Sequence, residues 1–186
     1  MSTPRTPPPA RLVCSLFSKD EAVIMENIGA LCGLFGPLSF QSLTIPFCET
    51  SYYTDEFGNG LKRVFIGFQN LIDQALLSEV KLKAVDLERR SMSDGKRLVN
   101  IDPGLLTSER LVLATGKNFS HRIYLGKGVF ADLTLVCKDK KFRPLPWTYP
   151  DYMSEGILRL WDEAKRAYLL DLKAARAADS SASGPG

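Results

Sequence analysis

His121 is the only histidine in the chain, and it lies close to two side chains that could bind an anion. Lys117 precedes it, Arg122 follows it directly, and Asp102 stands at the end of the preceding predicted strand. Lys and Arg bind phosphate and carboxylate groups, Arg through two parallel hydrogen bonds. A histidine that a carboxylate orients can act as a general base. The sequence therefore predicts an anion site, with Asp102 and His121 as candidate catalytic residues and Lys117 and Arg122 as ligand-binding residues.

The same residues also have structural explanations. A single histidine often only hydrogen-bonds the backbone, and Asp102 before Pro103 and Gly104 is good turn chemistry. Consecutive side chains of a strand point to opposite faces. His121 and Arg122 can therefore share one pocket only if the strand begins after His121 or carries a bulge. Both interpretations stay open.

Aromatic residues beside prolines or cations form a second group of candidates. Trp147 and Tyr149 lie in the proline-rich stretch PLPWTYPDY, a stiff loop that suits the stacking of a base or another ring. The alternative is a structural clasp, in which Trp147 fills the gap between the sheet and a C-terminal helix. Tyr53 near Arg63 poses the same choice. The full set of predicted ligand-binding residues is Lys117, Arg122, Tyr124, Trp147, Tyr149, Tyr53 and Arg63.

Composition and motifs exclude several functional classes. A net charge of +3 over 186 residues is too small for a protein that coats nucleic acid. The four cysteines form no CxxC pair, so with a single histidine no zinc site of the usual Cys/His spacing is expected, and no spacing of carboxylates predicts a specific magnesium site. Neither Gly116-Lys117 nor Gly126-Lys127 is followed by Ser or Thr, as a P-loop requires. A conventional P-loop GTPase therefore does not fit the sequence.

Apolar periodicity predicts the order strand, helix, strand, strand, helix, strand in the first hundred residues. The strands are expected at residues 11–18, 39–47, 62–68 and 96–102, and the helices at about 19–35 and 74–90. Ser18 and Glu21 have the form of a capping box, and Pro103-Gly104 should end the fourth strand. This order predicts a mixed α/β (α+β) fold, a ferredoxin-like split βαβ antiparallel sheet with two helices on one face. A hairpin over residues 121–137 and a closing helix from about Ser154 should extend it.

The chain is expected to form one domain over residues 11–177. Residues 1–10 are proline-rich and residues 178–186 are small and polar, so both are predicted to be disordered tails. The N-terminus lacks the apolar segment of a signal peptide, and no stretch approaches the roughly 18 apolar residues of a spanning helix, so no membrane association is expected. Scattered cysteines are typical of a reducing compartment, which predicts a cytoplasmic location.

Four unusual strings, YYTDEFGNGLKR, VNIDPG, NFSHRIYLGKG and PLPWTYPDY, resemble a prokaryotic family known as domain of unknown function 4416. The resemblance runs from about Arg11 to Trp161. It implies no established activity, and the GTP-binding label that is loosely attached to such proteins lacks the residues it needs here.

Two functional hypotheses follow. In the first, the tyrosine-bearing loops and the His/Lys segment form a polar-aromatic pocket for a small anionic or nucleotide-like ligand. In the second, the chain is a non-enzymatic protein- or RNA-interaction module whose loops are docking surface. Convergence of Asp102, His121 and Arg122 on one pocket would favour the first, and their scattering over different faces would favour the second. No motif in the sequence names a cofactor, a reaction or an oligomeric state.

Overall fold

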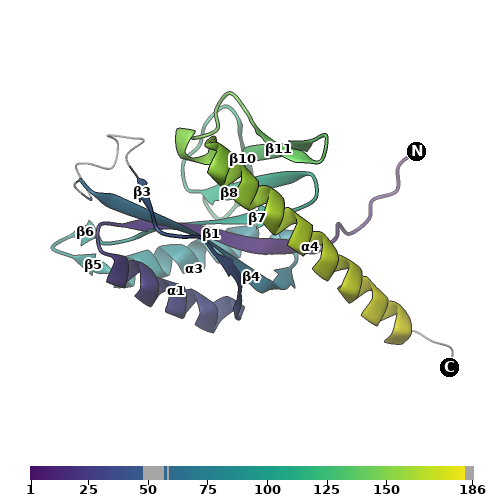
Figure 1. The fold of residues 1–186 in the computed structure, drawn as a ribbon, viewed down its shortest axis with the longest axis horizontal. Helices are drawn as coiled ribbons and strands as arrows, with labels where there is room; N and C mark the ends of the chain where they lie inside the picture. Colours follow the sequence, from purple (N-terminus) through teal and green to yellow (C-terminus); the bar gives the residue numbers. More distant parts are fainter. Residues whose placement is uncertain (48–56, 58, 183–186) are drawn as a thin grey trace.

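The computed structural model describes residues 1–47, 57 and 59–182, with side chains to residue 177 (Figure 1). The helices are α1 (Glu21–Phe35), α3 (Leu77–Arg90) and α4 (Glu155–Ala182), with the short 3-10 turns η2 (Gln74–Leu76) and η3 (Pro150–Tyr152). The strands of the first half are β1 (Ala10–Ser18), β2 (Leu38–Gln41), β3 (Ile45–Phe47), β4 (Leu61–Ile72), β5 (Met92–Ser93) and β6 (Lys96–Arg97). Those of the second half are β7 (Asn100–Leu106), β8 (Arg110–Thr115), β9 (Arg122–Gly126), β10 (Val129–Lys138) and β11 (Lys141–Pro144).

Nine of these strands form one sheet in the order β11-β10-β8-β7-β1-β4-β2, with β3 paired to β4 and β9 paired to β10. Every pairing is antiparallel. The small β5–β6 hairpin is separate. The predictions of a mixed α+β fold, an antiparallel sheet and a β9–β10 hairpin are therefore confirmed.

The helices cover both faces of the sheet (Figure 1). The apolar stripes of α1 and α3 pack against alternate residues of β1, β4 and β7, among them Leu12, Val64 and Ile101. On the opposite face, the predicted stripe of α4, which includes Trp161 and Tyr168, packs against the residues that point the other way. This division follows from the strand alternation, because both sets of side chains are apolar in the central strands.

The start of α1 differs from its predicted capping box. Asp20, not Ser18, is the N-cap, because its side chain accepts a hydrogen bond from the N–H of Ala22. The Ser18 hydroxyl instead accepts from the N–H of Asp20 and donates to the carbonyl of Leu98 at 2.5 Å. Ser18 therefore ties the end of β1 to the chain that enters β7.

The predicted end of the fourth strand at Pro103-Gly104 is wrong, since β7 continues to Leu106. From Gly104 onward β7 gains a second neighbour, β8, which the sequence analysis did not identify as a strand. A Cβ at Gly104 would lie 2.5 Å from the carbonyl oxygen of Val112. The glycine therefore allows close approach of β8 rather than a turn.

Two other predicted elements have different limits. The expected strand at 39–47 is split into β2 and β3, and Leu43 between them is 85% exposed. The closing helix α4 continues to Ala182, five residues into the segment that was predicted to be a tail. At the other end, the carbonyls of Pro8 and Pro9 accept hydrogen bonds from Gln74 and Tyr168. No helix in the described part of the chain is long and apolar enough to cross a membrane.

Candidate functional site

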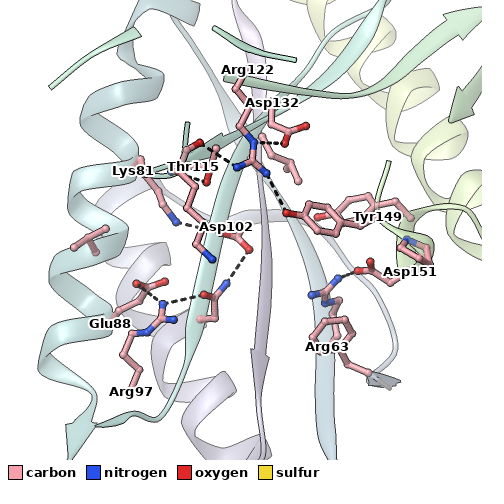
Figure 2. A pocket seen from close by; sticks show the side chains of 18 residues that line it. Arg63, Lys81, Glu88, Arg97, Asp102, Thr115, Arg122, Asp132, Tyr149 and Asp151 are labelled. Atoms are coloured by element: carbon pink, nitrogen blue, oxygen red, sulfur yellow. Dashed lines mark hydrogen bonds and ion pairs between the residues drawn. The ribbon is translucent and has the colours of Figure 1, made fainter. Parts of the chain in front are cut away.

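A cavity of about 350 Å³ lies where β7 and β8 separate (Figure 2). The two strands pair only over Gly104–Leu106 on the β7 side. Before that point β7 stays with β1, and the outer edge of its first half is open. Its first residues, Asn100 and Asp102, line the cavity together with Thr115 at the end of β8.

Helix α3 supplies the polar groups that the open edge of β7 requires. Lys81 donates to the carbonyl of Ile101 at 2.8 Å, and Glu88 accepts from the N–H of Ile101 at 2.6 Å. Lys81 and Glu88 are seven residues apart, which places them two turns apart on one face of the helix. A buried strand edge without such partners would leave costly unpaired backbone groups. These two side chains thus close the edge and reach the cavity wall.

A chain of charged and polar side chains follows the same wall. Lys81 donates to Asp102 at 3.1 Å, and Asn100 donates to the other oxygen of Asp102 at 2.7 Å. Arg97 donates to Asn100 at 2.9 Å and to Glu88 at 3.2 Å. Burial raises the pKa of Glu88, although Lys81, the N–H of Ile101 and Arg97 act in the opposite direction.

Arg122 holds the opposite part of the wall. Its Nε donates to Asp132 at 2.8 Å, one terminal nitrogen donates to the carbonyl of Lys117 at 3.0 Å, and the other donates to the hydroxyl of Tyr149 at 3.0 Å. Burial lowers the pKa of Arg122, but the hydrogen bonds and charges of Asp132 and Tyr149 outweigh it and raise that pKa above its ordinary value. The guanidinium is therefore a fixed positive charge with a defined orientation.

A third ion pair anchors the loop that carries η3. Arg63 of β4 pairs with Asp151, and both side chains are buried. The guanidinium of Arg63 also lies over the ring of Phe47, 3.7 Å from its centroid. Because a buried charge is stable only with partners, this pair holds η3 against the sheet at the edge of the cavity.

His121 does not line this cavity. Its Nε2 lies 3.3 Å from the same Asp132 oxygen that Arg122 binds, and its ring faces a separate, mostly apolar hollow of about 410 Å³. Strand β9 begins at Arg122, so His121 precedes the strand and both residues reach Asp132. The prediction that Asp102 orients His121 is wrong. The carboxylate within hydrogen-bonding distance of His121 is Asp132, while Asp102 accepts hydrogen bonds from Lys81 and Asn100.

Of the predicted aromatic residues in the described part of the chain, one lies in the cavity and two lie outside it. Tyr149 lines the cavity. Trp147 does not: it stacks on His121 with ring centroids 5.0 Å apart and donates to the carbonyl of Leu133. Tyr124 lies in the hairpin, where its hydroxyl accepts from the N–H of Gly128. Tyr53 lies outside the described residues.

The structure therefore brings together five of the predicted site residues, which are Arg63, Asp102, Lys117, Arg122 and Tyr149. Five further charged residues of the same lining were not among the predicted site residues, and they are Lys81, Glu88, Arg97, Asp132 and Asp151. One signal was present for two of them. Lys81 and Glu88 lie beside the apolar stripe of a helix that buries them, where a solvated charge is not expected.

Metal ligation is not supported within residues 1–47, 57 and 59–177. No group of three or more His, Cys, Asp or Glu side chains there could hold an ion. The carboxylates of the cavity instead pair with cations, so the arrangement suits hydrogen bonding and charge recognition.

Comparisons with curated proteins and with solved structures found no match. One family model, described as Domain of unknown function (DUF4416), matches residues 8–168. The matched segment contains every residue of the cavity lining. Since this family model matches most of the chain, the protein belongs to this family of domains of unknown function.

Proposed function

We propose that the cavity binds a small anionic or nucleotide-like ligand. The observation that carries this proposal is the fixed position of two buried cations from different elements. Only 8% of the Arg122 side chain and 9% of the Lys81 side chain are exposed, and both line the same cavity. A preorganised charge loses little freedom on binding, which favours affinity.

Both cations retain hydrogen-bonding capacity. A guanidinium has five N–H groups and an ammonium has three. Within the described chain, Arg122 donates three hydrogen bonds and Lys81 donates two. The remaining N–H groups are available to acceptor atoms of a ligand.

The neighbouring carboxylates stabilise these buried cations. The lining contains five cationic side chains and four carboxylates. An anionic ligand would therefore add hydrogen bonds to cations that are already paired, and need not neutralise a large excess of charge. Asp102, one of the two candidate catalytic residues, lines the same cavity as the cations, so we propose that it contacts the bound ligand.

Calorimetry and thermal shift test the proposal with inorganic phosphate, ribose 5-phosphate and the four ribonucleoside monophosphates. A ligand selective for the native state raises the melting temperature. Arg122→Lys keeps the charge beside Asp132 but loses the fork geometry, so affinity should fall by about tenfold or more. Arg166→Lys is the control, because Arg166 is exposed on α4.

Two results would refute the proposal. The first is that none of these anions changes the melting temperature. The second is that Arg122→Lys and Arg166→Lys bind the ligand equally well.

A protein- or RNA-interaction module is the second candidate, and strand β9 favours it. In the described sheet β9 pairs with β10 alone, and Ile123 and Tyr124 are 71% and 61% exposed. An exposed strand edge can accept a strand from a partner. This candidate predicts that Ile123→Lys abolishes association measured by light scattering or RNA titration, whereas Arg122→Lys leaves it unchanged.

We also propose the finer description of the fold as ferredoxin-like. It is supported by the order β7-β1-β4-β2, in which all neighbours are antiparallel, and by α1 and α3 on one face. The β8–β11 strands are then an extension of that core. A solved structure of a relative with the same β1–β7 order but without β8–β11 would test this description.

A cytoplasmic location remains part of the proposal. It is supported by the free thiols of Cys14, Cys32 and Cys137. Cell fractionation tests it, and recovery of the protein outside the cytoplasm would contradict it.

A further inference from the structure

We infer that Asp102 and Lys81 together recognise a nucleobase, so that the ligand is a nucleoside phosphate rather than a simple anion. This inference rests on the proposed function, because it concerns the same cavity. It assigns separate parts of the wall to the two ends of the ligand.

Asp102 is the most accessible of the cavity carboxylates. Its side chain is 30% exposed, whereas Glu88, Asp132 and Asp151 are exposed by 6–8%. Each oxygen of Asp102 accepts one hydrogen bond from a described residue, from Lys81 and from Asn100. A carboxylate has about four acceptor positions. Asp102 therefore has acceptor positions left for a ligand.

Lys81 places a donor directly beside this acceptor. Its ammonium lies 3.1 Å from Asp102 and has one N–H beyond the two used within the described chain. An acceptor next to a donor matches the polar edge of a nucleobase, where an N–H or NH₂ group stands beside a carbonyl oxygen or a ring nitrogen. The dianion of a phosphate monoester offers only acceptors, and the charge of Asp102 would repel it.

The anionic end of the ligand belongs at Arg122 and Tyr149. There Asp132 is already engaged by Arg122 and by His121, which reduces its repulsion of a bound phosphate. The hydroxyl of Tyr149 accepts from Arg122, so its own proton remains available to donate. Figure 2 shows Arg122 and Tyr149 on a different side of the cavity from Lys81.

The size of the cavity is consistent with a ligand of two parts. Its volume of about 350 Å³ falls in the range of small-molecule pockets. A polar group that is built to bond a ligand donor strongly disfavours analogues without that donor. Asp102 should therefore determine specificity, while Arg122 should determine affinity for every phosphorylated ligand.

Titration calorimetry tests this division with ribose 5-phosphate and the four ribonucleoside monophosphates. The wild-type protein should bind at least one nucleotide about tenfold or more tightly than ribose 5-phosphate. Asp102→Asn should remove that preference, because the amide has only two acceptor positions, one of which Lys81 occupies, and places an NH₂ donor where the second carboxylate oxygen stood. Its affinity for ribose 5-phosphate should be unchanged or higher. Asp86→Asn, on the exposed face of α3, is the matched control and should keep the preference.

Asp102→Ser is a second variant in case Asp102→Asn alters folding, and the melting temperature of each variant is measured without ligand. Equal binding of ribose 5-phosphate and all four nucleotides by the wild-type protein would overturn the inference and leave the proposed anion site standing. Retention of the preference in a folded Asp102 variant would also overturn it. Absence of binding by every phosphate would overturn the proposed function as well.

Discussion

Glu88 is held out of water between the N–H of Ile101 and the guanidinium of Arg97. Burial raises its pKa above the ordinary value of 4.5. The folded protein therefore binds this proton more tightly than the unfolded chain does. The resulting stabilisation is complete below pH 4.5 and is lost as the pH rises through the raised pKa, at about 1.4 kcal/mol per unit of pKa difference.

Glu88→Gln should remove this pH dependence, because the amide carries no charge and its oxygen still accepts from Ile101. The free energy of unfolding of the wild-type protein relative to the variant should fall as the pH rises from 4.5, and then become constant. Urea unfolding between pH 4 and pH 8 measures it. Glu163→Gln on the exposed face of α4 is the control, and a difference independent of pH would contradict the prediction.

At the level of single residues, the sequence identified polar side chains near predicted strand ends and missed those of helix α3. Asp102 and Arg122 could be found because unlike polar residues cluster near a predicted strand end. The contact between Glu88 and Arg97 could not be predicted, since it depends on how α3 packs against β7. Whether His121 and Arg122 can reach the same partner depends on whether β9 begins before or after His121. The first residue of a strand is among the least certain parts of a sequence-based prediction.

Gly104 shows how one missing side chain determines an element. A Cβ there would meet the carbonyl oxygen of Val112 at 2.5 Å and a methyl carbon of Leu113 at 2.8 Å. Relief would require β8 to move away from β7, so Gly104→Ala should destabilise the protein by about 1–3 kcal/mol. Chemical unfolding checks this. Gly29→Ala in α1 is the control, because nothing lies within 4 Å of its added Cβ and it should be neutral or stabilising.

Among the elements, those with a long periodic pattern were predicted well. The buried residues of α1, α3 and α4 are the ones that the helical spacing selects. Pro103 and Gly104 favour turns, which is why the sequence predicts a strand end there, although both lie inside β7. Their position in β7 depends on pairing with β1 on one side and on the approach of β8 on the other, which no local pattern contains.

The whole molecule depends on α4 for one face of its sheet. Helix α4 buries its own Trp161 and Tyr168 against the sheet, so that 1% of each is exposed. A chain that ends at residue 153 should leave this face open, lose its cooperative thermal transition and bind a hydrophobic dye. A chain that starts at Pro8 is the control. It should keep the wild-type melting temperature, because Pro8 and Pro9 are the first residues along the described chain that hydrogen-bond to the rest of the domain. A cooperative transition in the shorter chain would show that α4 is dispensable.

The architecture as a whole followed from the sequence only in part. The order of strands and helices and their antiparallel arrangement could be inferred from periodicity and short connections. The separation of β7 from β8 could not be inferred, because β7 pairs with β1 along its whole length but with β8 only from Gly104 onward. The cavity lies at that separation, so its location could be recognised only after the strands were placed.

The ion pair between Arg11 and Asp171 joins the first strand to the last helix. On a ribosome, β1 is synthesised long before α4, and about 8–30 s pass between Ser18 and Leu172 at synthesis rates of about 5–20 residues per second. Throughout this interval the apolar face that α4 covers in the folded protein stays exposed, and the guanidinium of Arg11 lacks its partner carboxylate. The nascent chain therefore exposes this apolar face until its C-terminal helix emerges, and association with other chains is expected chiefly in this interval.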